Sequence, residues 1–151
     1  MLQPTHEPPL PPEFWSRLEA GETVPFQGLG DSMRPFFPSG TWFLLRQDPI
    51  HQLQVGDIVF MLREDQPIVH RITALPSKDS SQLKTCGDCY YEDDPPWKPS
   101  QYRARVVGTL EDKTRDSRRL KMPHDLLATL YRHAGPAIRI GLKMYRRIKK
   151  R

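Results

Sequence analysis

The 151-residue chain lacks the features that mark membrane-spanning and secreted proteins. It contains no run of about 18 consecutive apolar residues, so no membrane-spanning helix is predicted. Its polar, proline-rich start lacks the basic and then apolar layout of a secretory signal peptide. Together these two absences predict a cytoplasmic protein.

Cysteine is scarce, because the chain has only Cys86 and Cys89, spaced C-x-x-C. A zinc site would need further ligands at a suitable spacing, and a thioredoxin-like redox pair would lie beside a βαβ pattern. The sequence shows neither, and the acidic segment 90–97 has no EF-hand pattern. We therefore predict no metal and no cofactor, and interpret the cysteines as two thiols beside a turn.

The net positive charge of the protein comes from the end of the chain. Residues 1–112 carry 10 Lys or Arg and 16 Asp or Glu, a net charge of −6, whereas residues 113–151 carry 13 and 2, a net charge of +11. A nucleic-acid-binding domain would be basic over its body, and no helix-turn-helix or aromatic-basic platform is present. Nucleic acid is therefore not the expected partner, although the basic tail alone could touch phosphates.

The order of turn and strand signals predicts a mainly β protein. Residues 1–11 are proline-dense and predict a disordered lead, and Pro12 opens a short helix that Gly21 ends. Runs with strand-like composition follow, separated by glycine, proline and polar turns, at residues 23–27, 41–46, 58–62, 67–74 and 102–110. We expect one antiparallel β domain over residues 12–112, with 41–46 largely buried.

Residues 113–151 predict a basic linker followed by amphipathic helices. Apolar residues recur at helical spacing from Pro123 onward, Gly135-Pro136 interrupts the pattern, and lysines and arginines occupy the opposite face. Such helices cover the core of their own domain, lie on an anionic membrane or dock onto an acidic partner. All three alternatives stay open for this tail.

Ser32 stands in a turn that suits a nucleophile. Gly30 frees the backbone before it, and Pro35 holds its own predecessor extended, so the hydroxyl is displayed at the end of a strand. Any surface loop shares that geometry. His70 lies within a predicted strand, on one face with Ile68 and Ile72, where a histidine is more often packed than catalytic.

Five short blocks occur in a fixed order along the chain. They read G-x-S-M-x-P at 30–35, G-D-I-V at 56–59, P-I-V-H-R-I at 67–72, T-x-G-D at 85–88 and D-D at 93–94. Over roughly residues 23 to 110 this order resembles type I signal peptidases, in the histidine-using branch of archaea and the endoplasmic reticulum.

The resemblance implies a β-rich fold and a serine peptidase site. It implies that Ser32 is the nucleophile, His70 the general base and Asp94 the supporting acid, with Asp88 close to the site. Bacterial signal peptidases and the SOS-response self-cleaving repressors carry lysine where this chain has His70. Asp88 is alternatively a residue that hydrogen-bonds and shapes its loop.

The sequence predicts no membrane anchor, unlike the family, and it carries Cys86 and Cys89 where lysine and asparagine are usual. We predict a serine endopeptidase that cleaves a leader, signal or pro-segment of a protein or peptide substrate. The alternative is a non-catalytic or regulatory binding module of the same fold. A tail that does not cover the core of its own domain is expected to contact a membrane surface or a partner protein, and in the alternative function a membrane or nucleic acid.

Overall fold

The structure is a computed structural model that describes residues 10–78, 80–90 and 92–110, together with Ala137. Residues 1–9 of the predicted lead lie outside the described residues. So does the predicted basic tail, apart from Ala137.

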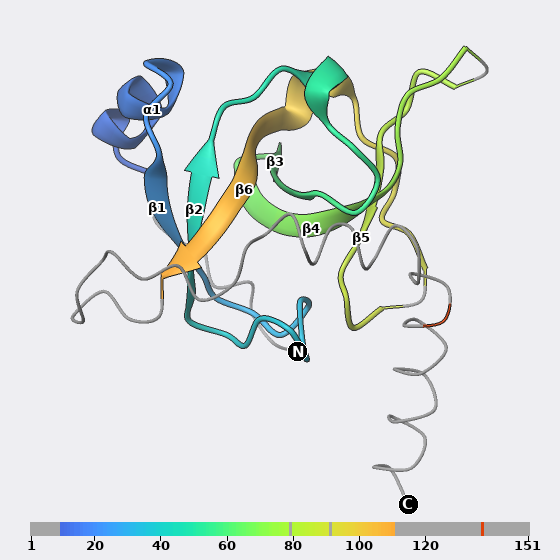
Figure 1. Ribbon diagram of the computed structural model, residues 1–151, viewed down its shortest axis with the longest axis horizontal. Helices are drawn as coiled ribbons and strands as arrows, with labels where there is room; N and C mark the ends of the chain where they lie inside the picture. The colour runs from blue at the N-terminus through green and yellow to red at the C-terminus, as the bar shows by residue number, and fades with distance from the viewer. Residues whose placement is uncertain (1–9, 79, 91, 111–136, 138–151) are drawn as a thin grey trace, which may run out of the picture.

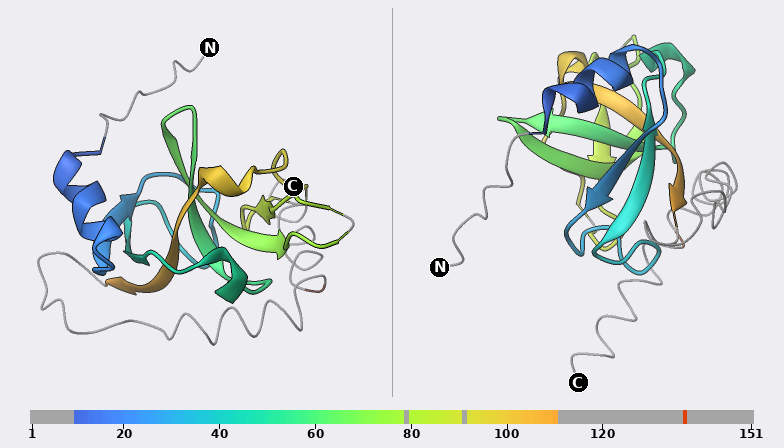
Figure 2. Two further views of the ribbon diagram at one scale, coloured as in Figure 1. Left: turned by 90° about the horizontal axis from the view of Figure 1, so that it is seen from above. Right: turned by 90° about the vertical axis from the view of Figure 1, so that its left-hand side faces the viewer.

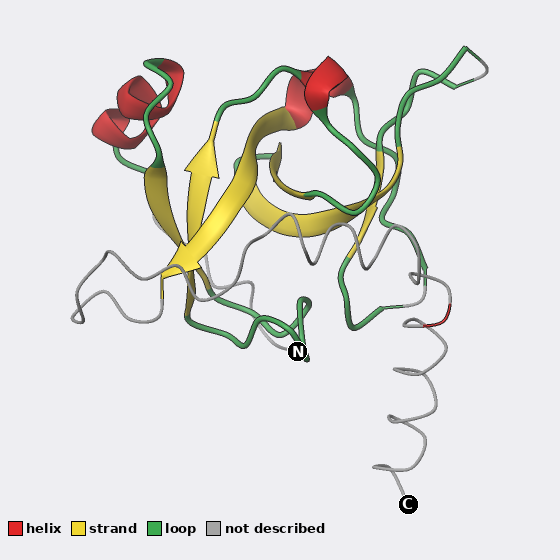
Figure 3. Ribbon diagram, in the orientation of Figure 1, coloured by secondary structure: helices red, strands yellow, loops and turns green. Residues whose placement is uncertain are grey.

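Six strands form one antiparallel sheet, and the predicted mainly β class is confirmed (Figures 1 and 3). The strands are β1 (Val24–Gly28), β2 (Thr41–Arg46), β3 (Ile58–Arg63), β4 (Gln66–Ala74), β5 (Lys84–Cys86) and β6 (Tyr102–Leu110). Their order in the sheet is β1-β2-β6-β3-β4-β5, so the last strand of the sequence lies in the middle. The sheet is strongly twisted, and β4 runs across the direction of β2 and β6 (Figure 1).

The predicted short helix is confirmed as α1 (Pro12–Glu19), which lies beside β1 at one end of the sheet (Figure 2). Pro12 occupies the first turn, where its missing N–H is not needed, and Gly21 follows the helix with a φ of 79°. The buried Phe14 and Leu18 join the core with Phe26 and Phe60 of the sheet. Two single 3₁₀ turns, Ile50–Gln52 and Pro99–Gln101, were not predicted from the sequence.

Strand β3 is covered on both faces, which explains its uninterrupted apolar run. Ile58 and Phe60 belong to one core cluster, and Val59 and Met61 belong to a second cluster on the other side. Strand β2 differs from the expectation of a largely buried strand. Its alternate residues Phe43 and Leu45 are buried, whereas Trp42 and Leu44 on the other face are half-buried.

Strands β3 and β4 form the predicted hairpin, which determines where His70 points. Arg63 pairs with Gln66 across a two-residue turn whose residues, Glu64 and Asp65, have φ values of 50° and 65°. The side chains of β4 then alternate between the two core clusters. Within the described part of the chain, no helix has the length and apolar character needed to cross a bilayer.

Candidate active site

Ser32 lies in the loop between β1 and β2, in a turn that is anchored by buried residues next to it. Met33 and Phe37 are buried in the first core cluster, and the Phe37 amide donates a 3.0 Å hydrogen bond to the Met33 carbonyl. The Phe37 ring packs on Phe43 of β2 with 5.5 Å between ring centroids. These anchors leave Ser32 partly buried at the surface of the core.

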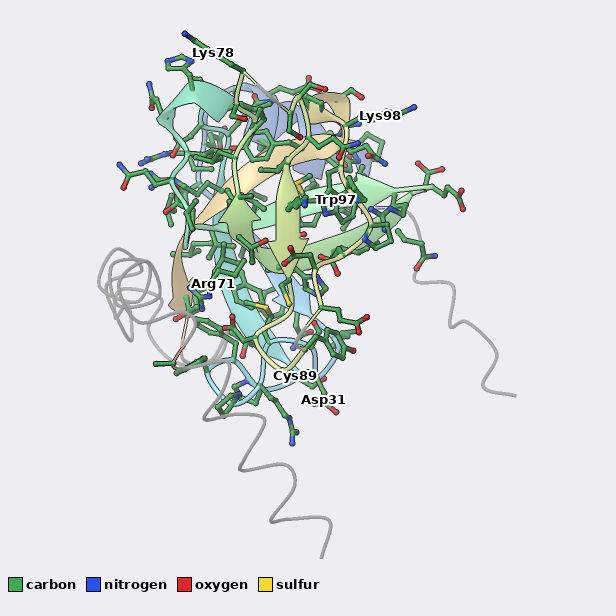
Figure 4. The ribbon with its side chains drawn as sticks, turned by 90° about the vertical axis from the view of Figure 1, so that its right-hand side faces the viewer. Asp31, Arg71, Lys78, Cys89, Trp97 and Lys98 are labelled. Carbon is green, nitrogen blue, oxygen red and sulfur yellow. The ribbon has the colours of Figure 1, made fainter. Side chains whose placement is uncertain are left out.

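The loop after β5 packs directly against Ser32. The amide of Cys89 donates a 2.9 Å hydrogen bond to the Ser32 carbonyl. At Gly87 a Cβ atom would lie 2.7 Å from the Ser32 carbonyl oxygen and 3.1 Å from the Ser32 Cβ, so only glycine fits this contact. Figure 4 shows Asp31 and Cys89, from segments far apart in the sequence, at the same end of the molecule.

His70 is paired with Asp94. The Nδ1 atom of His70 lies 2.6 Å from Oδ2 of Asp94, and only 7 % of the histidine is exposed. Asp94 reaches this position because its amide donates a 2.8 Å hydrogen bond to the Thr85 carbonyl of β5. The neighbouring Asp93 bonds to Thr73 instead, at 2.9 Å. The backbone therefore selects which of the two adjacent aspartates meets the imidazole.

The surroundings of Asp94 favour its ionised form. Burial raises the pKa of Asp94, but the hydrogen bond and charge of His70, the Thr85 hydroxyl and the charge of Arg63 together outweigh burial. The pKa of Asp94 is therefore lowered from its ordinary value of 3.8. The carboxylate is negative at neutral pH and can accept hydrogen bonds from both neighbours.

Ser32 and His70 line the same cavity, which has a volume of about 200 Å³. Most of the remaining wall is apolar, with Phe26, Phe43 and Val69 among its residues. Within the described residues no hydrogen bond joins the Ser32 hydroxyl to the imidazole. Such bonds are often long in unliganded sites and tighten when substrate binds.

Asp88 is buried in an ion pair with Arg71, the residue after His70. The guanidinium donates hydrogen bonds of 2.8 and 2.7 Å to the two carboxylate oxygens, and both side chains are 1 % exposed. Arg71 also donates a 3.0 Å bond to the carbonyl of Gly56. Asp88 thus links its loop to β4, in line with a loop-shaping role that acts through this ion pair.

Sequence reasoning missed three residues that support the site: Arg71, Thr85 and Trp97. Trp97 is 1 % exposed, and its indole Nε1 donates a 2.7 Å hydrogen bond to Oγ1 of Thr85, which in turn donates at 2.5 Å to Asp94. For Arg71 a signal did exist, since a charged residue inside an otherwise apolar strand needs a buried partner of opposite charge. Thr85 is the first residue of the T-x-G-D block, but its hydroxyl was assigned no role there. For Trp97 no such signal is visible.

Cys86 and Cys89 are both buried, and no disulfide joins them. The Cys86 thiol lies 3.0 Å from the Glu92 carbonyl. This contact stabilises the loop after β5, and the sulfur is buried. Over the described ranges, no three His, Cys, Asp or Glu side chains are grouped so that they could hold a metal ion.

Comparison with known protein-family models and with curated proteins finds no match for this chain. The chemistry of the site therefore follows from its geometry. A serine and a histidine share a cavity wall, and a partly buried carboxylate contacts the far side of the histidine. This arrangement is able to activate a hydroxyl for attack on a carbonyl group.

Proposed function

We propose that this protein is a serine endopeptidase with a signal-peptidase-like fold, and that it removes a leader, signal or pro-segment from a protein substrate. One observation carries the proposal: Ser32 and His70 line one cavity, and Asp94 contacts the imidazole nitrogen at 2.6 Å. The order of the sequence blocks supports the same function independently of that geometry.

In the proposed reaction His70 accepts the hydroxyl proton as Ser32 attacks the carbonyl carbon of the scissile peptide bond. The protonated imidazole then gives this proton to the leaving amine, and an acyl-enzyme remains on Ser32. Water, deprotonated by His70, hydrolyses that ester and restores the serine. Asp94 orients the imidazole and stabilises its positive charge, and backbone N–H groups around Ser32 hold the oxyanion.

The cavity suits an apolar substrate side chain beside the scissile bond. Its volume is about 200 Å³ and the wall around Ser32 is formed largely by aromatic and aliphatic side chains. The apolar wall would leave a charged side chain without partners. The resemblance to signal peptidases implies cleavage after small residues, and the apolar wall adds a preference for uncharged ones.

The function is tested by incubating the purified protein with a peptide library and identifying new termini by mass spectrometry. Ser32→Ala and His70→Ala should each abolish cleavage, and the double variant should be no worse, because the two groups act as one unit. Ser16→Ala, on α1, and His51→Ala, on an exposed turn, are the matched controls. Cleavage that persists in Ser32→Ala would overturn the proposal.

A non-catalytic binding module of the same fold is the second candidate, favoured by the unjoined Ser32 hydroxyl and imidazole within the described residues. Calorimetry with the library peptides separates the two candidates. A binding module binds the peptides equally well before and after the Ser32→Ala substitution, and it turns none of them over. A peptidase consumes the peptides only when Ser32 is present.

The basic tail is proposed to bring this site to its substrate. Residues 113–151 have a net charge of +11 and a predicted apolar stripe. We propose that they form amphipathic helices that bind an anionic membrane surface or an acidic partner protein. The charge contrast with residues 1–112, whose net charge is −6, supports a separate role for the tail.

A further inference from the structure

The hydrogen bonds behind His70 form a chain in which each link has a defined direction. Trp97 Nε1 lies 2.7 Å from Thr85 Oγ1, Thr85 Oγ1 lies 2.5 Å from Asp94 Oδ2, and Asp94 Oδ2 lies 2.6 Å from His70 Nδ1. Thr85 is fully buried and Trp97 is 1 % exposed, so water does not compete for these groups. This series of hydrogen bonds therefore runs from Trp97, in the second core cluster, to the imidazole of His70.

The direction begins at Trp97, because an indole N–H can donate but cannot accept. Thr85 Oγ1 therefore accepts from Trp97, and the single hydroxyl proton is left to point at Asp94. Asp94 Oδ2 must accept that proton. The same oxygen then accepts from His70 as well, which requires that Nδ1 of His70 carries its hydrogen.

We propose that Trp97 and Thr85 are positioning residues that fix the tautomer of His70, holding the hydrogen on Nδ1 and leaving Nε2 free to accept the Ser32 proton. Thr85 and Trp97 act through Asp94 and contact neither substrate nor the reacting atoms. The importance of this role for catalysis rests on the proposed peptidase function. The tautomer of His70 does not depend on that function.

The position of Trp97 is fixed independently of Thr85. Its backbone pairs with Leu83 through bonds of 2.9 and 3.3 Å, and the guanidinium of Arg63 lies 3.8 Å from the centre of its ring. Arg63 also donates a 2.8 Å bond to the carbonyl of Pro95. These contacts orient the indole N–H without any contribution from Thr85. The donor direction of the hydrogen-bond series is therefore set by Trp97.

The lowered pKa of Asp94 agrees with this direction. A protonated carboxyl would place its own hydrogen on one oxygen and would compete with the donors from Thr85 and His70. An ionised carboxylate has lone pairs for both. Without the Thr85 hydroxyl, the Asp94 carboxylate would lose one of its two donors and would be held by the hydrogen bond from His70 alone.

The test uses the full chain and two readouts. The first is the ¹⁵N NMR signal of the His70 ring at alkaline pH, where imidazoles are neutral; it reports which nitrogen carries the hydrogen, and His70→Gln assigns it. The second is peptide cleavage, resolved into kcat and KM. The variants are Thr85→Val, which removes the hydroxyl at constant shape, Thr85→Ser, which retains it, and Trp97→Phe, which removes the indole N–H.

We expect a single Nδ1–H tautomer in the wild type and in Thr85→Ser, and a mixture in Thr85→Val. The value of kcat should fall about 10- to 100-fold in Thr85→Val, as for other residues that orient a functional histidine. KM should change little, because Thr85 does not line the cavity. Trp97→Phe should lie between wild type and Thr85→Val, since the hydroxyl remains but can turn away.

Matched controls separate this role from packing. Thr73→Val removes a hydroxyl that bonds to the neighbouring Asp93 at 2.9 Å, and it should alter neither readout. An unchanged tautomer in both Thr85→Val and Trp97→Phe overturns the proposal, as does a Thr85→Ser variant as impaired as Thr85→Val. If no variant and no wild type cleaves peptide while the tautomer still depends on Thr85, the positioning role stands and the peptidase function fails.

Discussion

At the residue scale, the site depends on one contact that only a residue without a side chain permits. Gly87 faces the Ser32 backbone so closely that an added Cβ would lie 2.7 Å from the Ser32 carbonyl oxygen and 2.8 Å from the Tyr90 ring. Both neighbours are tied to the same loop by backbone hydrogen bonds of 2.9 Å, from Cys89 to Ser32 and from Tyr90 to Gly87. The absence of a side chain at Gly87, in the T-x-G-D block, therefore allows this loop to pack directly against Ser32.

Gly87→Ala should displace Ser32 and lower peptide cleavage by about 100-fold, since a shift of about 1 Å at a reacting group has effects of that size. Ser16→Ala is the control, because Ser16 is exposed on α1 and does not line the cavity. Cleavage rates and melting midpoints of both variants check the expectation. Wild-type activity in Gly87→Ala would mean that the contact does not position the serine.

Asp94 should give the protein an acid-sensitive share of its stability. Because the folded-state pKa of Asp94 is lowered from 3.8, its contribution is fully present above that value and is lost as the pH falls through the lowered folded-state pKa. We expect Asp94→Asn to be less stable than wild type at neutral pH, with a difference that shrinks in strong acid. Urea unfolding over a series of pH values measures it. A difference that stays constant down to about pH 2 would contradict the expectation.

At the scale of elements, the Arg71–Asp88 ion pair joins β4 to the loop that carries Gly87 and Cys89. His70 precedes Arg71 on β4, and Cys89 follows Asp88 and bonds to the Ser32 carbonyl at 2.9 Å. One buried pair therefore sets the spacing between the strand with the general base and the loop against the nucleophile.

Asp88→Asn should destabilise the protein by about 3–5 kcal/mol, because it removes the negative charge that is paired with the buried Arg71 guanidinium. Asp31→Asn provides the matched control: the Asp31–Arg34 pair is 67 % and 59 % exposed on its two side chains. An exposed pair contributes at most about 1 kcal/mol. Equal unfolding free energies for the two variants would show that the buried pair does not hold β4 to the loop.

At the scale of the whole molecule, the twist of the sheet brings together segments that are far apart in the chain. The loop after β1 and the loop after β5 both leave the sheet at its lower side in Figure 1, and the Cys89–Ser32 hydrogen bond joins them. The proposed site is therefore built where an early loop, the β4 strand and a late loop meet.

The basic tail should add reversible binding to anionic membranes. Each lysine or arginine near such a surface contributes about 1 kcal/mol, and salt screens the attraction. The full chain should sediment with anionic vesicles at low salt and be released at high salt. Replacing Lys143, Arg146 and Arg147 by glutamate should abolish sedimentation without changing peptide cleavage in solution. Neutral vesicles are the control, and equal binding to them would contradict an electrostatic tail.

The sequence by itself determined the elements whose signals are local. Strand β6 was predicted with the observed ends, Tyr102 and Leu110, because its alternating pattern lies between clear turn signals. Helix α1 was predicted from Pro12, Gly21 and its apolar face. Ser32, His70, Asp88 and Asp94 were named from the order of short blocks, which is also a property of the chain alone.

Only the tertiary structure decided which of these residues touch. Strand pairing places β6 between β2 and β3 and sets the register from which His70 meets Asp94 rather than Asp93. The contacts of Gly87 with Ser32 and of Trp97 with Thr85 join residues through the bends of the late loop. Local propensity carries no information about such contacts, because a shift of one residue in strand register would exchange the faces of the strand and separate every one of these pairs.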